Sequence, residues 1–431
     1  MSTLPSSRRS PWPVWLCWLA MVLDGFDLVV LGTVIPTLIK SGDLGFNAVA
    51  ATFAATISLV GVGLGALFIA PLSDKFGRRK LLIACVAGFS LFTIAIAFAP
   101  NVAVFSVLRL LAGLGLGACL PAALAYMNDY SPAGSAGKST TRTMTGYHAG
   151  AVATAFLAIM VVPNWRLMFI IGGAAGLLLL PFLWAKLPES LPGLAAKPGL
   201  ATKPASAVGR STGTQAPAET PAPKAGFREL LHKPYPLVAL GIGIASFMGL
   251  LLVYGLNTWL PQLMAAAGYP VSTGLTLLLV LNLGAVAGLV LAGILADRHG
   301  TRRVVLLWFG LSAVLLGGLS IRIESEVLLN AAVFVTGVFV FSSQVLVYAW
   351  VSQLFPARLR GTALGFAAGV GRLGAIVGPA VTGTLVATGT AYPAGFYVFG
   401  GAALLGLAAL VLVPRTTQAA IAPEAVREPA G

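Results

Sequence analysis

The sequence VWLCWLAMVLDGFDLVVLGTVIPTLI runs from Val14 to Ile39 and is apolar except for two aspartates near its middle, Asp24 and Asp27. A run of about 20 apolar residues is long enough to cross a bilayer as a helix. A charge buried at that depth costs at least about 2.5 kcal/mol and usually marks a functional site. The two aspartates are three residues apart, so they share one face of a helix. The stretch therefore predicts a membrane-spanning helix with an ion or substrate site. The alternative is a polar pair that hydrogen-bonds a neighbouring helix.

The composition of the whole chain agrees with a membrane location. The chain has 431 residues, of which 58% are hydrophobic and only 9% are charged. Soluble proteins carry about 25% charged residues. We therefore expect a multi-pass membrane protein with the lipid bilayer as a partner. A net charge of +14 would indicate nucleic-acid binding in a soluble chain. Here we attribute the charge to cytoplasmic loops and expect no nucleic-acid partner.

Twelve apolar segments are long enough to be membrane spans. We expect the first six at about residues 14–39, 49–72, 80–99, 102–126, 143–162 and 167–186, and the second six at about 235–264, 275–296, 304–321, 327–351, 361–387 and 395–413. The segment between the two sets is rich in Pro, Ala, Lys and Thr, which is typical of a flexible linker. The domains predicted are a tail (1–13), a six-helix half (14–186), the linker (187–234), a second six-helix half (235–413) and a tail (414–431).

The positive charges predict how the chain crosses the membrane. Lys and Arg are concentrated in the cytoplasmic loops of membrane proteins. With both termini placed in the cytoplasm, 22 of the 27 Lys and Arg residues lie on the cytoplasmic side. The other five are Lys40, Arg166 and Arg322, which fall outside, and Arg109 and Arg372, which fall within spans. We therefore expect a protein of the cytoplasmic (inner) membrane with cytoplasmic termini.

A loop motif occurs once in each half. Asp74–Arg79 (DKFGRR) follows the second span, and Asp297–Arg302 (DRHGTR) follows the eighth. Two parallel halves joined by a linker are typical of transporters in which the halves rock about a central site, and helix-end ion pairs can be remade in such a motion. The residues predicted to take part in gating are Asp74, Gly77, Arg78 and Arg79 in the first copy and Asp297, Arg298, Gly300 and Arg302 in the second.

The two loop motifs resemble those of the major facilitator superfamily, and the likeness covers nearly the whole chain. The fourth span adds the pattern Arg109-x-x-x-Gly113-x-Gly115-x-Gly117, which is similar to the same superfamily. The resemblance implies an all-α membrane protein with twelve transmembrane helices in two pseudo-symmetric halves, and a transporter rather than an enzyme. The proline-bearing pattern of drug–proton antiporters is missing from the fifth span, which argues against drug export.

Within that superfamily, Asp24–Asp27 (DGFD) resembles the aromatic acid:proton symporter family. Asn257–Pro261 (NTWLP), Gly371–Pro379 (GRLGAIVGP) and Pro188–Ser190 (PES) are similar to the same family. The resemblance implies proton-coupled import of acids such as benzoate, hydroxybenzoates or protocatechuate by alternating access. A symporter of a non-aromatic acid, a sodium-coupled symporter and a transporter-like sensor are the alternatives.

Two arginines within spans, Arg109 and Arg372, are candidates to bind the carboxylate of a substrate. A guanidinium keeps its charge, so each needs an anion or several acceptors, and its planar fork suits a carboxylate. Alternatively, each pairs with an aspartate or with backbone carbonyls, and Arg109 could serve helix packing or proton coupling. The glycines beside Arg372, Gly371 and Gly374, are expected to leave space next to it.

The remaining candidates complete the predicted site. Asp24 and Asp27 are assigned to proton coupling, because protonation of one aspartate cancels the charge that a bound monoanion adds. Trp259 near the end of its span could instead belong to the aromatic belt at the membrane interface. The other residues predicted to contact substrate are Phe26, Tyr254, Asn257, Trp259, Gln344 and Tyr348.

The sequence offers no pattern for enzyme chemistry. It contains no metal-ligand spacing, nucleophile–base pair or phosphate-binding loop, so we expect no catalytic residue, no metal and no cofactor. Glycine strings within the spans are interpreted as sites of close helix packing. The three cysteines, Cys17, Cys85 and Cys119, lie in or beside apolar runs and are interpreted as small interior residues. We expect the protein to act as a monomer.

Overall fold

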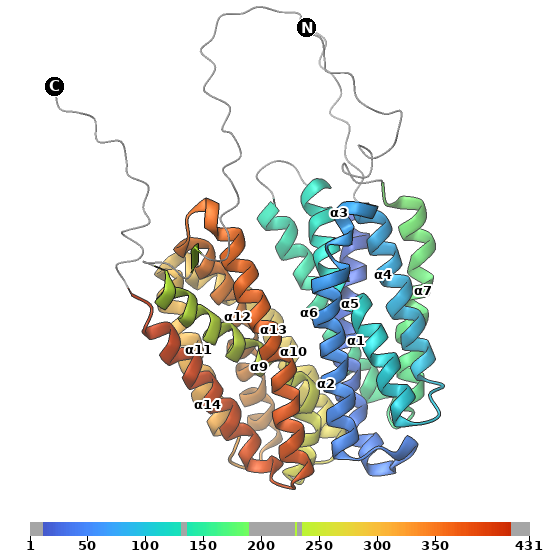
Figure 1. The fold of residues 1–431 in the computed structure, drawn as a ribbon. Helices are drawn as coiled ribbons and strands as arrows, with labels where there is room; N and C mark the ends of the chain where they lie inside the picture. The colour runs from blue at the N-terminus through green and yellow to red at the C-terminus, as the bar shows by residue number, and fades with distance from the viewer. Residues whose placement is uncertain (1–11, 131–135, 189–228, 231–234, 415–431) are drawn as a thin grey trace, which may run out of the picture. The chain divides into compact units, whose positions relative to one another are not determined.

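The computed structural model describes residues 12–130, 136–188, 229–230 and 235–414. All regular elements within these ranges are helices (Figure 1). The side chain of Asp74, one of the predicted gating residues, lies outside the description. The same is true of most of the predicted linker and of both predicted tails.

The helices before the linker follow the predicted spans closely. They are α1 (Trp12–Ser41), α2 (Ala48–Leu64), α3 (Leu72–Phe76), α4 (Arg78–Ile96), α5 (Val102–Tyr130), α6 (Ala136–Val161) and α7 (Trp165–Lys186). A π-helical turn, Gly65–Ile69, continues α2. The short α3 forms the loop motif with the turn that follows it.

The helices after the linker number six in the described part of the chain. They are α9 (Pro236–Ala266), α10 (Val271–His299), α11 (Thr301–Gly318), α12 (Glu326–Leu354), α13 (Ala357–Ala387) and α14 (Ala391–Val411). Among the described residues, eleven helices are long and apolar enough to cross a membrane, and Thr145–Val161 within α6 is a shorter apolar helix. The predicted all-α architecture with twelve membrane helices is confirmed.

The chain forms two compact units that differ slightly from the two sets of helices. One unit is Met1–Ala201 with Asn257–Asn282, and the other is Thr202–Leu256 with Leu283–Gly431. The boundary passes through α9 and α10, so the end of α9 and the start of α10 pack with the first set. A side chain at Gly32 of α1 would overlap the carbonyl of Asn257. This close approach shows why the segment groups with the first unit.

Glycines set the spacing of the helices within the first unit. On α1 and α6, a side chain at Gly25 would overlap the Tyr147 carbonyl, and one at Gly150 would overlap the Val22 carbonyl. On α5, Gly113 and Gly117 lie against the backbone of α2 in the same way. Small residues let membrane helices approach until their backbones touch. The interpretation of the glycine strings as packing sites is confirmed for Gly113 and Gly117.

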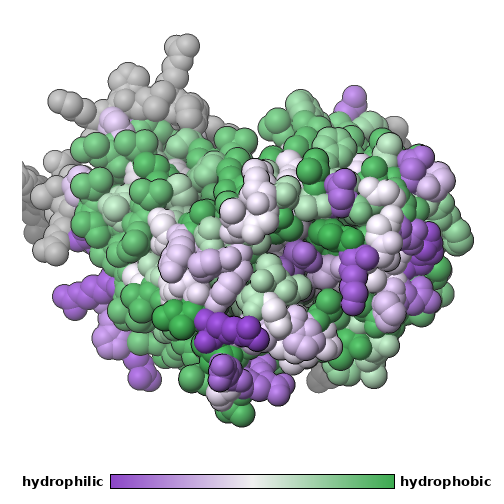
Figure 2. Space-filling view, turned by 90° about the horizontal axis from the view of Figure 1, so that it is seen from below, coloured by the Kyte–Doolittle hydropathy of each residue, from purple (hydrophilic) through white to green (hydrophobic). Residues whose placement is uncertain are grey.

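The helices expose many large apolar side chains, as expected of a membrane protein. Seen from below, the face in Figure 2 mixes hydrophilic and hydrophobic side chains, with hydrophobic ones along much of its rim. Large apolar side chains on the helices are widely exposed, among them Phe68 at 64%, Leu178 at 71% and Val314 at 71%. Exposed apolar area of this extent indicates contact with lipid.

Candidate functional site

A buried ion pair joins α1 to α5. The Asp27 Oδ1 atom accepts a hydrogen bond from Thr93 of α4 (3.0 Å) and lies 3.3 Å from Arg109 Nη1. The Nη2 atom of Arg109 also donates to the Asp27 backbone carbonyl (3.2 Å). Both Asp27 and Arg109 are 2% exposed. Of the alternatives for Arg109, pairing with an aspartate is therefore what the structure shows, and contact with substrate stays a prediction.

The second carboxylate oxygen of Asp27 differs from the first in its contacts. Asp27 Oδ2 has no hydrogen-bond partner among the described residues. A buried acceptor without a partner is costly, and a proton on this oxygen would remove the charge while the Oδ1 contacts stay in reach. The arrangement can therefore hold Asp27 in two protonation states.

Asp24 lies one turn before Asp27 and faces the same helices. It is 3% exposed, and it lies near Cys85 of α4 and Cys119 of α5. The shared face that the three-residue spacing predicted is thus turned toward α4 and α5. The three cysteines are buried and form no disulfide, in line with their interpretation as interior residues. No metal-binding group of His, Cys, Asp or Glu occurs in the described part of the chain.

Phe26, which lies between the two aspartates in the sequence, contacts α7. Its ring is 8% exposed and fills the notch left by Gly172 on α7, where a side chain would overlap the ring. Phe26 is therefore part of a helix contact, and its contact with substrate stays a prediction.

On α6, the rings of Tyr147 and His148 pack edge to face with centroids 5.3 Å apart.

A second polar cluster lies in the other unit, on α9, α12 and α13. Arg372 Nη1 donates to the hydroxyl of Tyr254 at 3.2 Å. Tyr348 lies close to Arg372, Tyr254 and Gln344. Gln344 is 4% exposed and packs against Gly249 of α9. The fold thus brings together four residues that the sequence analysis proposed as substrate contacts.

The glycines beside Arg372 do not leave the open space that we expected. A side chain at Gly374 would overlap the Phe247 carbonyl, and one at Gly371 would come within 2.8 Å of the Leu250 side chain. Both positions are filled by α9. Their role is to bring α13 against α9, which places Arg372 beside Tyr254.

Asn257 and Trp259 belong to the first unit. Asn282 Nδ2 donates to Asn257 Oδ1 (3.1 Å) and to the Leu278 carbonyl (3.0 Å), and both amides are buried. Asn257 Nδ2 and Asn282 Oδ1 have no hydrogen-bond partner within the described ranges. Trp259 is 0% exposed, so the interpretation as a residue of the membrane-interface belt is wrong.

Asn282 was missed by the sequence analysis. It is the single polar residue in the run LLLVLNLGAVAG (277–288). An isolated amide within an apolar span is itself a signal of function or of a buried polar contact.

The two loop motifs make the same local structure. Gly77 (φ 92°, ψ 140°) and Gly300 (φ 85°, ψ 135°) form the turns before α4 and α11. These angles are open to glycine and strained for other residues. The turns fix the position of the arginines that follow.

Those arginines bind the ends of other helices in their own unit. Arg79 Nη2 donates to the Trp184 carbonyl (2.5 Å) near the end of α7, and Arg302 Nη2 donates to the Val413 carbonyl (3.2 Å) just after α14. Cations are favourable at helix C-termini. Arg78 Nη1 donates to the Ala125 carbonyl within α5 (2.7 Å) and not to a helix end.

Two other predicted gating residues, Asp297 and Arg298, are exposed. Arg78, Arg79 and Arg302 are half-buried. Asp297 makes no ion pair with any residue that the structure describes. The gating role of the motif stays a prediction.

Comparison with known proteins places these features in a family. Residues 17–291 and 276–430 match the family model described as Major Facilitator Superfamily. A gentisate transporter from Corynebacterium glutamicum is 35% identical over 420 residues, which are 96% of this chain and 90% of the relative. A gallate transporter from Pseudomonas putida is 33% identical (89% and 87% covered). A benzoate transport protein from Acinetobacter baylyi is 32% identical (92% and 88% covered).

Solved structures agree on the fold. A D-xylose–proton symporter superposes with a TM-score of 0.70 at 18% identity, covering 93% of this chain and 96% of its own. A nucleoside transporter superposes with a TM-score of 0.71 at 13% identity, covering 94% and 99%. The chain therefore belongs to the major facilitator superfamily, as a multi-pass membrane transporter related to transporters of aromatic acids and not as an enzyme.

Proposed function

We propose that this protein imports aromatic carboxylic acids together with protons by alternating access. It would do so as a monomer in the cytoplasmic (inner) membrane, with both termini in the cytoplasm. The relatives that transport gentisate, gallate and benzoate support the substrate class. The charge distribution among the loops supports the orientation.

The observation that carries the proposal is the buried pair of Asp27 and Arg109. The Oδ1 atom of Asp27 is engaged by Thr93 and Arg109, while Oδ2 has no partner among the described residues. Protonation at Oδ2 neutralises the aspartate and weakens its attraction to Arg109. The pair can therefore link proton binding to the packing of α1 against α5.

Proton coupling suits the import of an anion. Moving one negative charge inward against a potential of 100 mV, negative inside, costs about 2.3 kcal/mol. A proton carried with a monoanion cancels that cost. A proton gradient then drives accumulation of the acid.

The substrate carboxylate is assigned to Arg372. Its planar fork can bind both carboxylate oxygens, and its Nη1 atom donates a hydrogen bond to the Tyr254 hydroxyl, which helps to orient the guanidinium. Tyr254, Tyr348 and Gln344 offer aromatic surface, hydroxyls and an amide for the ring and its substituents. Phe26, Asn257, Trp259 and Arg109 remain candidates for further contacts. The loop motifs are assigned to the conformational step.

Uptake into proteoliposomes tests the proposal. Labelled benzoate, gentisate, gallate and 4-hydroxybenzoate are offered separately, with an imposed pH gradient, with a sodium gradient, and with neither. We expect accumulation of at least one acid under the pH gradient alone. Accumulation driven by the sodium gradient alone would show that sodium and not the proton is the coupling ion. Accumulation of none of the four acids would rule out the aromatic substrate class.

A further inference from the structure

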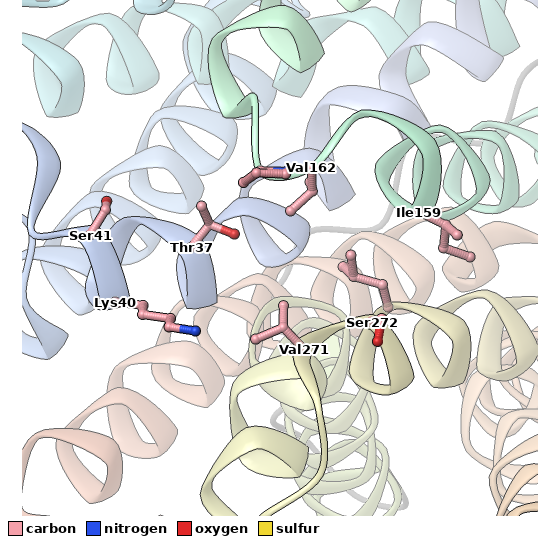
Figure 3. A pocket seen from close by; sticks show the side chains of 9 residues that line it. Thr37, Lys40, Ser41, Ile159, Val162, Val271 and Ser272 are labelled. Carbon is pink, nitrogen blue, oxygen red and sulfur yellow. The ribbon is translucent and has the colours of Figure 1, made fainter.

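A cavity of about 490 Å³ opens at the end of α1 in the first unit (Figure 3). The last turns of α1 provide a polar side with Thr37, Lys40 and Ser41. Ile159 at the end of α6 and Val271 at the start of α10 provide apolar surface. Small-molecule sites in proteins are typically about 300–1,000 Å³ and combine apolar walls with a few polar groups. The cavity has the size and composition of such a site.

The cation in this cavity is available to a ligand. Lys40 makes no ion pair or hydrogen bond with any residue that the structure describes. The acid nearest to it in sequence, Asp43, is already bound by Arg166 (2.8 Å) and by the indole of Trp165 (3.0 Å). In Figure 3 the Lys40 side chain extends along the cavity toward Val271. A single ammonium beside apolar surface fits an anion with an apolar body.

We propose that this cavity is a second binding site for the aromatic carboxylate, occupied before the substrate reaches Arg372. The inference rests on the proposed function, which makes this end of α1 the outer one and the acid the substrate. The carboxylate would lie at Lys40 and the ring on Val271 and Ile159. Thr37 and Ser272 would offer hydroxyls to ring substituents. An exposed cation at the entrance also raises the rate of encounter with an anion.

Protection of an introduced thiol tests binding directly. Ser272→Cys places one reactive thiol at the cavity, since the three native cysteines are buried. In right-side-out vesicles, benzoate and gentisate should slow its labelling by an impermeant maleimide. The protection should disappear when Lys40→Ala is added and remain with Lys40→Arg. Glu324→Cys, at an exposed position in the other unit, is the control that the acids should not protect.

Uptake kinetics test whether the site serves transport. Lys40→Ala should raise the KM for uptake about threefold with an unchanged maximal rate, the effect of losing one exposed ion pair. Val271→Trp fills the cavity without changing its charge and should raise KM in the same way. Lys186→Ala removes an exposed cation from the last turn of α7 and should leave KM unchanged.

The outcomes separate this inference from the proposed function. Wild-type accumulation with no acid-dependent protection, and with normal KM in both cavity variants, overturns the cavity site alone. An effect of Lys40→Ala without one of Val271→Trp indicates general surface charge and also overturns it. Protection by phosphatidylglycerol in nanodiscs, with none by benzoate, would assign the cavity to a lipid. Lys40-dependent protection without any accumulation keeps the site and removes the proposed function.

Discussion

Arg109 holds Asp27 at two points, with Nη1 3.3 Å from the carboxylate Oδ1 and Nη2 3.2 Å from the backbone carbonyl. The second contact does not depend on the charge of the aspartate. A proton on Asp27 therefore weakens the contact at the carboxylate and leaves the contact at the backbone carbonyl, so the two residues stay joined.

Asp27→Asn should abolish accumulation driven by a pH gradient. Asparagine can still accept from Thr93 but cannot carry the proton. Breaking a buried pair costs about 3–5 kcal/mol, so thermal stability in detergent is measured beside uptake. Exchange of labelled for unlabelled acid, which needs no net proton movement, should persist. Asp24→Asn should also lose accumulation, whereas Asp43→Asn in the loop after α1 should keep it. Accumulation at the wild-type level by Asp27→Asn would show that this acid is not required for coupling.

Arg372→Lys should weaken binding of the acid by about 1–3 kcal/mol, because it keeps the charge and loses the bidentate fork. Arg372→Ala should be worse, and it should erase most of the preference for an acid over its neutral amide. Direct binding of benzoate and benzamide to the purified variants measures both effects. If Arg372→Ala prefers the acid as strongly as wild type does, the carboxylate binds elsewhere and Arg109 becomes the first candidate.

Gly77→Ala and Gly300→Ala should each lower stability by about 1–3 kcal/mol, because alanine is strained at their φ values of 92° and 85°. They should slow transport more than they change substrate affinity, since the turns position Arg79 and Arg302. The control is Gly88→Ala in α4, where a side chain meets open space and the backbone is helical. Melting temperature and the initial rate of uptake are the measurements. A normal rate and stability in all three variants would contradict the role of these turns.

Asn282→Leu should destabilise the first unit, because it leaves the Asn257 amide buried with fewer partners. Hydrogen bonds between membrane helices are worth about 0.6 kcal/mol on average and up to about 1.7. The double variant Asn257→Leu/Asn282→Leu should recover part of that loss, since replacing both partners is cheaper than removing one. A double-mutant cycle of melting temperatures measures the coupling. Additive losses would mean that the two amides do not stabilise each other.

The loop after α1 should show a pH-dependent stability. Hydrogen bonds from Arg166 and Trp165 lower the pKa of Asp43 below its ordinary value of 3.8. A lowered folded-state pKa means that the stabilisation is present above that ordinary value and is lost as the pH falls through the lowered pKa. The pair is partly exposed, so its contribution is about 1 kcal/mol at most. The difference in melting temperature between wild type and Asp43→Asn should shrink between pH 6 and about pH 3. A difference that grows on acidification would refute this reading.

Local chemistry allowed much of the fold to be predicted. An apolar run long enough to cross a bilayer has few alternatives to a helix, because no water is present to hydrogen-bond an open backbone. Hence the twelve predicted spans coincide with helices, and most of their ends agree within a few residues. The i, i+3 spacing of Asp24 and Asp27 likewise required a shared face, whichever helices that face met.

The partners of these residues depended on tertiary structure. Asp27 and Arg109 are 82 positions apart and Arg372 and Tyr254 are 118 apart, and periodicity within a span says nothing about the rotation of one helix against another. The same limit explains Gly374, which the sequence marked as space and the fold fills with the backbone of α9. The local composition of the chain sets which segments are long and apolar enough to cross a membrane and which charges lie within them. Which of these charges meet depends on how the helices pack, because residues so far apart in the chain come into contact only through that packing.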